Sequence, residues 1–265
     1  MADIEHIKRL VYVSIPFAML SQDYLSAFVS HGLNAEIGLD AQTLQGTDME
    51  RFRVVKRIFS DAGLRVTLHG PFIDMSPGSP DPEVRALTMK RFEDVIRIAE
   101  IFEPTSIVLH AGYEQKRYGF VKEVWFENSL ATWQWVAGAV SDQDTMVCLE
   151  NVFEEHPSYL LPLFEELGAS GIKFCLDIGH QAAFSQARLE EWLSILGRFV
   201  GQLHLHDNNG KADQHKAIGS GTIDFNFVFK WLRDHFTEPP IITLEPHREE
   251  DLLPSLKWLE DNWPW

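Results

Sequence analysis

The sequence contains little cysteine and no long apolar run, and each absence narrows the kind of protein it encodes. Of 265 residues only Cys148 and Cys175 are cysteines, and each lies in an apolar segment where a small buried side chain fits better than half of a disulfide. No apolar run approaches the roughly 20 residues needed to span a bilayer. The N-terminus carries acids where a secretion signal would be basic. We therefore expect a cytoplasmic protein in a reducing compartment, with no membrane partner.

Basic residues are also scarce. Lysines and arginines number 23 against 39 aspartates and glutamates, which gives a formal net charge of −16. Such a charge repels nucleic acid and anionic membranes at long range. A local basic cleft is compatible with this balance, so the charge disfavours a nucleic-acid partner without excluding one.

Short apolar runs alternate with longer amphipathic segments. Eight runs are each short enough for a strand and almost continuously apolar, which is typical of a parallel sheet covered by helices on both faces. The predicted strands cover residues 9–17, 33–39, 64–70, 105–111, 145–151, 172–180, 201–207 and 240–247.

Segments with helical periodicity lie between these strands. In residues 48–63, for example, Phe52, Val55 and Phe59 share one face before Gly63 ends the helix. The other predicted helices cover residues 81–102, 120–140, 157–168, 188–199, 224–236 and 249–262, with one more within 18–32. This order, without a Pro/Gly/Ser-rich linker, predicts an α/β protein with a single (β/α)8 TIM barrel over residues 1–265. An open doubly wound sheet is the alternative, but the turn after the first strand lacks a glycine-rich phosphate motif.

Histidines and carboxylates gather at the carboxyl ends of the predicted strands, which in a barrel surround one mouth. Burying so many ionisable groups without partners would be costly, and a divalent cation removes that cost. Imidazole and carboxylate without thiolate suit zinc, manganese or iron rather than a structural cysteine site, and the set exceeds what one ion binds. The candidate metal ligands are His69, His110, Glu150, Asp177, His180, His204, Asp213, His215 and Glu245.

Other polar residues and two loops near the mouth are weaker candidates for substrate contacts. The backbone N–H groups of loop 219–225 could bind a phosphate or sugar oxygen, although a simple tight turn before a helix capped by Asp224 fits equally well. The proline- and glycine-rich loop 70–82 is either a lid or wall of the site or a stiff connection. The individual candidates are His206, His247, Lys216 and Arg248.

The chain resembles the xylose isomerase-like TIM-barrel superfamily, which contains endonuclease IV and the sugar or sugar-phosphate isomerases and epimerases. The resemblance covers nearly the whole chain and lies in the segments LHGPF, VLHAG, CLEN, CLDIGH, LHLHDN, DQHKAIGSG and LEPH. In endonuclease IV such segments bind a trinuclear zinc cluster. By position, the resemblance implies one ion at His69, His110 and Glu150, a second at Glu150, Asp177, His204 and Glu245, and a third at His180, Asp213 and His215.

The isomerase and epimerase members imply a smaller centre. Their single zinc or manganese ion would lie on Glu150, Asp177, His204 and Glu245, with Glu150 and Glu245 as the catalytic acid/base groups. The resemblance thus implies one to three ions per chain. An acidic chain favours a small substrate, so the sequence favours a metal-dependent isomerase or epimerase of a sugar or sugar phosphate, in carbohydrate metabolism.

The alternative is a zinc phosphodiesterase of the endonuclease IV kind, an abasic-site endonuclease. The argument for a phosphodiesterase is that Asp213 and His215 would have no evident purpose around a single ion. A metal-binding scaffold without catalysis is a third reading, disfavoured because open coordination in a barrel mouth usually serves chemistry. The sequence leaves the oligomeric state open.

Overall fold

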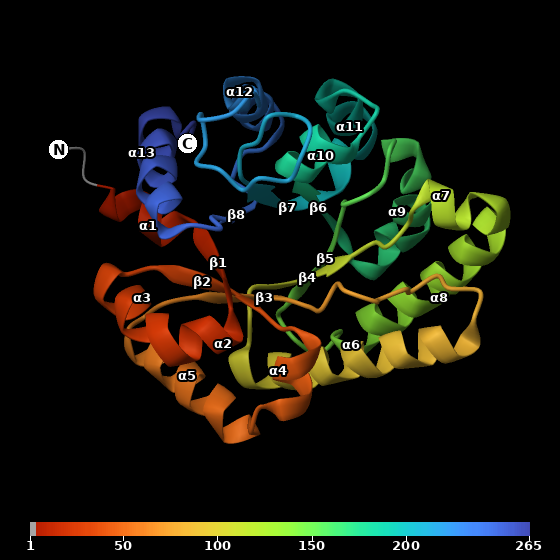
Figure 1. The fold of residues 1–265 in the computed structure, drawn as a ribbon, viewed down its shortest axis with the longest axis horizontal. Helices are drawn as coiled ribbons and strands as arrows, with labels where there is room; N and C mark the ends of the chain where they lie inside the picture. Colours follow the sequence, from red (N-terminus) through yellow and green to blue (C-terminus); the bar gives the residue numbers. More distant parts are fainter. Residues whose placement is uncertain (1–3) are drawn as a thin grey trace.

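The predicted strands close into a barrel. In the computed structural model, which describes residues 4–265, eight parallel strands follow one another in chain order, and β1 pairs with β8 to complete the circle. This confirms the (β/α)8 prediction, and Figure 1 shows the helices arranged around the strands. The strands are β1 (Tyr12–Pro16), β2 (Asn34–Gly38), β3 (Val66–His69), β4 (Ser106–His110), β5 (Met146–Glu150), β6 (Lys173–Asp177), β7 (Val200–Leu205) and β8 (Ile241–Leu244).

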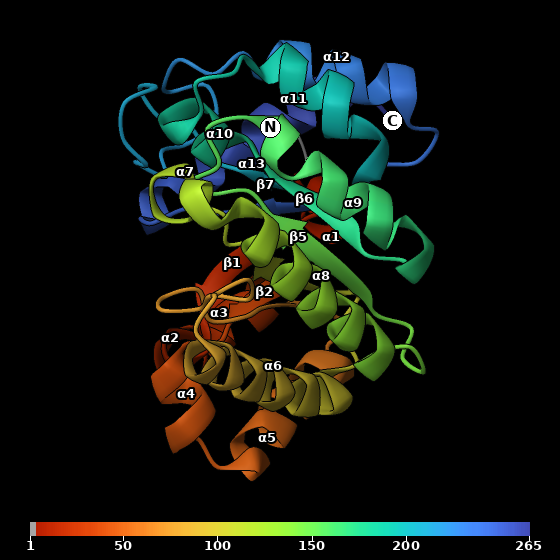
Figure 2. The same ribbon diagram turned by 90° about the vertical axis from the view of Figure 1, so that its right-hand side faces the viewer.

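Helices form the outer layer, and successive helices pack side by side. The helices are α1 (Glu5–Leu10), α2 (Phe17–Met19), α3 (Leu25–His31), α4 (Ala41–Gly46), α5 (Met49–Asp61), α6 (Pro82–Phe102), α7 (Gln115–Tyr118), α8 (Lys122–Ala139), α9 (Leu161–Leu167), α10 (Ile178–Phe184), α11 (Leu189–Leu196), α12 (Phe225–His235) and α13 (Leu252–Asn262). Helices α5, α6, α8 and α9 follow one another along one flank of the barrel (Figure 2). At the two ends of the described chain, α1 packs against α13.

Aspartate side chains cap the N-termini of several of these helices. Asp224 accepts a hydrogen bond from the N–H of Phe227 at 3.0 Å, which confirms its predicted capping role. The strand predicted over residues 172–180 is too long, because another aspartate caps a helix that begins within this range. Asp177 accepts the N–H of His180 at 2.6 Å and so starts α10 directly at the end of β6.

The helical layer also contains elements that the sequence did not predict. Helix α7 and a short 3-10 turn, η2 (Gly119–Val121), precede α8, which corresponds to the predicted helix 120–140. Helix α8 buries Trp125 and Trp133, as expected for indoles that face the core. Helices α1 and α4 have six residues each, too few to show a helical period in the sequence. Among the helices within residues 4–265, none is both long enough and apolar enough to cross a membrane.

The barrel interior below the strand ends is apolar on one side and polar on the other. Since side chains alternate along a strand, residues two positions before a strand-end ligand lie beneath it. Val108, Cys148 and Cys175 occupy such positions and form a small buried cluster. Both cysteines are therefore buried thiols, as predicted. On the polar side lie Glu36 and Gln202, which are fully buried.

Candidate metal centre

The strand ends bring all the predicted ligands together. The last residues of β3, β4, β5 and β6 are His69, His110, Glu150 and Asp177. The other ligands come from β7 (His204), α10 (His180), the residue after β8 (Glu245) and the loop after β7 (Asp213 and His215). The nine side chains fall into adjoining groups whose potential ligand atoms lie within 4.8 Å of one another.

Glu150 is the side chain that links these groups, because its two oxygens face different histidines. Its Oε2 lies 3.0 Å from Nε2 of His69 and 3.3 Å from Nε2 of His110. The same oxygen lies 3.5 Å from Nδ1 of His204. Its Oε1 instead lies 3.0 Å from Nδ1 of His180. Glu150 therefore contacts histidines of two neighbouring ligand groups.

A second group surrounds Nδ1 of His204. Oε1 of Glu245 lies 3.1 Å from this nitrogen, and Oδ2 of Asp177 lies 3.9 Å from it. Together with Glu150, these three residues make the four-ligand set expected for a single-ion centre. His204 and Asp177 are fully buried, whereas Glu245 reaches the cavity above.

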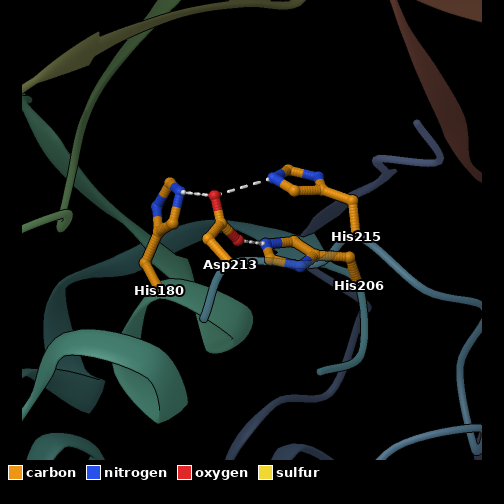
Figure 3. A group of neighbouring side chains, drawn as sticks. All are labelled: His180, His206, Asp213 and His215. Atoms are coloured by element: carbon orange, nitrogen blue, oxygen red, sulfur yellow. Dashed lines mark hydrogen bonds and ion pairs between the residues drawn. The ribbon is translucent and has the colours of Figure 1, made fainter. Parts of the chain in front are cut away.

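The third group is centred on the carboxylate of Asp213 (Figure 3). Its Oδ2 lies 3.0 Å from Nε2 of His215 and 3.4 Å from Nε2 of His180. Its Oδ1 lies 3.6 Å from Nε2 of His206. Sequence analysis placed His206 among the weaker substrate contacts, and the structure instead places it, buried, in this ligand group.

Backbone carbonyls orient three of the ligand imidazoles. Nδ1 of His69 lies 2.8 Å from the carbonyl oxygen of Gly70. Nδ1 of His180 lies 3.1 Å from the carbonyl oxygen of Asn151, and Nδ1 of His215 lies 2.9 Å from that of Glu245. In a neutral imidazole, an N–H that donates to a carbonyl leaves the opposite nitrogen as the one that can bind a cation. Each of these histidines therefore directs Nε2 towards the ligand groups.

The buried polar atoms of the centre fit a cation. Asp177 Oδ2, His204 Nδ1 and Asp213 Oδ1 are buried and form no hydrogen bond with other described residues. Leaving such atoms without partners is costly, and a divalent ion would satisfy them together. The donors are nitrogen and oxygen atoms, which suit zinc or manganese.

Neighbouring charges shift the pKa values of these groups. Burial opposes ionisation of Glu150, but His110 and His204 outweigh it and hold the pKa of its carboxyl well below the usual value. Burial also opposes a charge on His204, but Cys175 and the surrounding carboxylates outweigh it and raise the pKa of His204 well above the usual value. Burial, together with the charges of Asp177 and Glu150, raises the pKa of Glu245. Of these two carboxyls, Glu245 therefore holds a proton more readily than Glu150 in the metal-free protein.

A cavity of about 630 Å³ opens above the ligand groups. The loop predicted as a lid, a wall or a stiff connection forms a wall, since Phe72, Ile73 and Met75 line the cavity and Phe72 stacks on His110 with ring centroids 5.2 Å apart. Arg117 contributes the one arginine or lysine side chain among the residues of 4–265 that line it. A small substrate with both apolar and anionic parts fits such walls.

The remaining substrate candidates divide into two groups. His247 lines the cavity and stacks on His215 at a centroid distance of 3.6 Å. Lys216 and Arg248 do not line it within the described part of the chain. The guanidinium of Arg248 is bound by Asp251, with Nε 2.9 Å from a carboxylate oxygen. These two residues are thus not placed to contact a substrate in the cavity.

The glycine loop 219–225 is a structural turn. The backbone N–H groups of Gly219 and Gly221 donate to Oδ2 of Asp207 at 3.0 and 2.8 Å, and the N–H of Ile223 donates to its Oδ1 at 3.3 Å. Since a buried carboxylate already accepts these hydrogen bonds, these three N–H groups are not available to a phosphate. Of the two readings of this loop, the structure supports the tight turn.

Two buried glutamates near the centre were missed by sequence reasoning. Glu36 lies inside β2, with Oε1 2.9 Å from Nε2 of His204. Glu154 lines the cavity and accepts the N–H groups of Tyr113 and Val152, and burial raises its pKa to about 7. The signal for Glu36 was an acid in the middle of a predicted buried strand.

Comparisons with known proteins agree with the fold. A family model described as "Xylose isomerase-like TIM barrel" matches residues 33–262. A solved structure of a Thermus thermophilus protein soaked with ZnCl2 superposes with a TM-score of 0.80 and 27% identity, covering 95% of this chain and 97% of that one. An uncharacterized protein of Methanocaldococcus jannaschii is 28% identical over 206 residues, 75% of this chain and 70% of that protein.

More distant similarities include two kinds of enzyme name. A solved "D-tagatose 3-epimerase-like protein" superposes with a TM-score of 0.80 at 23% identity, covering 96% of this chain and 97% of that one. "Probable endonuclease 4" of Mycobacterium leprae is 23% identical over 210 residues, 74% of this chain and 79% of that protein. At this level of identity the structural match shows a shared fold.

Proposed function

The chain belongs to the xylose isomerase-like TIM-barrel family, and from this membership and the strand-end geometry we propose that it is a metal-dependent hydrolase of a small phosphate ester. The substrate class is a phosphorylated carbohydrate or a compound of similar size. The proposed centre holds two or three zinc- or manganese-class ions in the adjoining ligand groups.

The observation that carries the proposal is the position of Glu150 between two sets of histidines. Its Oε2 faces Nε2 of His69 and of His110, and its Oε1 faces Nδ1 of His180, whose opposite nitrogen, Nε2, faces Asp213. The Nε2 atoms of these histidines therefore lie in two different ligand groups, which are joined through Glu150, and a single ion would use only one of the groups. The geometry therefore favours several neighbouring ions, and such centres typically serve phosphoryl chemistry.

The protein's own groups have distinct roles in this proposal. When bound, the ions supply a nucleophile at neutral pH and neutralise charge on the phosphate. Arg117 is placed to pair with an anionic oxygen of the substrate, and the wall that contains Phe72 limits the access of water. Glu245 reaches the cavity, so its carboxyl group is placed to exchange a proton with the leaving oxygen.

Isomerisation or epimerisation of a sugar or sugar phosphate is the second candidate. Glu150, Asp177, His204 and Glu245 alone can hold one ion, and Glu150 and Glu245 both line the cavity, where they could move a proton between neighbouring carbons. The epimerase names among similar folds agree with this reaction. In this scheme the third ligand group has no role, which is why hydrolysis is preferred.

The number of bound ions distinguishes the two candidates. We expect elemental analysis of the zinc-saturated protein to find two or three ions per chain. Replacing Asp213 with Asn together with His215 with Gln should lower that number by about one, because both side chains face the third group. The same exchange at the exposed His31, H31Q, is the control and should change nothing. One ion in the unaltered protein would favour the isomerase.

Small and polymeric substrates should behave differently. We expect the zinc- or manganese-loaded protein to hydrolyse a small ester such as bis(4-nitrophenyl) phosphate, and not to incise abasic-site DNA at physiological salt. Binding of duplex DNA needs several phosphate contacts, and the net charge of −16 and a single cationic side chain among the described residues that line the cavity do not supply them. Efficient incision would assign the protein to the endonuclease alternative.

A further inference from the structure

The interior of a TIM barrel is normally filled with branched apolar residues, but here five polar side chains from five strands meet beneath the metal centre. We call them the polar floor. All five are completely buried. The polar floor consists of Glu36 (β2), Thr67 (β3), Ser106 (β4), Gln202 (β7) and Thr243 (β8).

One oxygen of Glu36 is fully occupied by the other members of the floor. Its Oε2 accepts hydrogen bonds from Gln202 Nε2 at 2.6 Å, Thr67 Oγ1 at 3.0 Å and Thr243 Oγ1 at 3.1 Å. The amide of Gln202 is itself oriented, because Ser106 donates to its Oε1 at 2.6 Å. These contacts fix the plane of the Glu36 carboxylate.

The other oxygen of Glu36 faces the metal centre through His204. Oε1 lies 2.9 Å from Nε2 of His204, and the opposite nitrogen, Nδ1, faces Glu245, Glu150 and Asp177. Glu36 does not line the cavity, whereas Glu150 and Glu245 do. Glu36 is thus separated from the substrate space by the imidazole that it contacts.

His204 needs such a partner because of its place in the fold. His69, His180 and His215 are oriented by backbone carbonyls outside the regular ladder of the sheet. His204 instead lies within β7, and its side chain points into the barrel, where strand carbonyls are engaged in pairing with β6 and β8. Two side chains reach its Nε2: Oε1 of Glu36 lies 2.9 Å from it and the amide nitrogen of Gln202 lies 3.2 Å from it. Since an amide nitrogen can only donate, the carboxylate of Glu36 is the one acceptor of these two for a proton on Nε2.

We propose that Glu36 is the positioning residue of the metal centre. It holds the proton of His204 on Nε2 and so presents an unprotonated Nδ1 to the ion at Glu150, Asp177 and Glu245. This inference rests on the metal centre of the proposed function, but not on the reaction that the centre performs. A carboxylate partner also makes the imidazole a stronger electron donor than a carbonyl partner would.

The substitution Glu36→Gln tests the inference through the tautomer of His204. Gln202 can only donate towards the former Oε2 position, so the new amide should turn its oxygen there and its NH2 group towards His204. Nε2 of His204 would then accept a hydrogen bond, and its proton would move to Nδ1, the nitrogen that must bind the ion. We expect zinc affinity to fall about 10- to 100-fold.

Zinc affinity is measured on the purified full chain by competition with a chromogenic chelator. Circular dichroism checks that the variant is folded. Histidine-selective 15N NMR of the zinc-loaded protein should show Nε2 of His204 protonated and Nδ1 bound to metal. Thr67→Val is the matched control, because it removes one donor to Glu36 and leaves the carboxylate on His204, so affinity should change less than about threefold.

A double variant gives a second, independent check. Adding Gln202→Glu to Glu36→Gln supplies an acceptor for the amide NH2 and returns the amide oxygen to His204, so zinc affinity should recover. The inference is overturned if folded E36Q binds zinc as tightly as the unaltered protein, or if His204 keeps its proton on Nε2. It also fails if the unaltered protein binds no zinc. Weakened zinc binding by E36Q in a protein that hydrolyses no phosphate ester would contradict the proposed reaction and leave the role of Glu36 intact.

Discussion

Exchanging Glu150 for glutamine is expected to reduce turnover by about a thousandfold or more, the scale seen when a group central to catalysis is lost. Both oxygens of Glu150 face imidazole nitrogens, at 3.0 Å on each side. An amide would present a donor to one side and would lack the negative charge that the cations require. The expected result therefore includes loss of bound metal as well as loss of activity.

The two effects are measured separately, by elemental analysis and by steady-state kinetics with zinc or manganese in excess. The same exchange at the exposed Glu165, whose carboxylate pairs with Arg198 at 3.0 Å, is the control. It should leave both quantities unchanged, because exposed ion pairs contribute little. If E150Q retained its ions and its rate, Glu150 could not be the link between the ligand groups.

The position of most ligands along the chain could be predicted because the fold is parallel. In a barrel all strands point the same way, so a polar residue at the end of an apolar run lies at the common mouth whatever its neighbours are. His69, His110, Glu150 and Asp177 obey this rule as the last residues of their strands. No knowledge of strand register was needed to group them.

Glu36 could not be predicted in this way, because its role depends on three-dimensional register. It lies two residues before the end of β2, and its partners come from β3, β7 and β8. Only the closed barrel brings these strands around one point. Without knowledge of that closure, an acid inside an apolar run cannot be assigned a role from the sequence.

Loop residues were the other weak part of the prediction. Lys216 and Arg248 lie in the segments that follow β7 and β8, and local partners decide where their side chains lie. The backbone of Lys216 pairs with that of Asp207, and the side chain of Arg248 binds Asp251. Sequence proximity thus did not place these two substrate candidates, although the loop after β7 does supply the predicted ligands Asp213 and His215.

Removal of metal should reverse the pH dependence of stability. The pKa values of His180, His204 and His215 are raised because carboxylates outweigh the effect of burial. A raised folded-state pKa gives stability that is complete below the unfolded value of about 6.5 and is lost as pH rises through the folded value. Burial lowers the pKa values of His110 and His247, which act in the opposite direction, but the three raised histidines outnumber them, so metal-free protein should lose stability above about pH 6.5. The raised pKa of Glu245 acts in the same direction.

Metal-loaded protein should show the opposite trend, because a cation binds imidazole only after the proton has left. Its free energy of unfolding should rise with pH over the same range. Zinc binding should make the metal-loaded protein about 2.7 kcal/mol more stable than the metal-free form once free zinc reaches a hundred times its Kd. Thermal melts between pH 5.5 and 8.5, with chelator or with excess zinc, measure both curves. The gap between them should widen with pH, since protons and cations compete for the same imidazole nitrogens. Two parallel curves would mean that the histidines do not bind the ion, and the assignment of the metal centre would then be wrong.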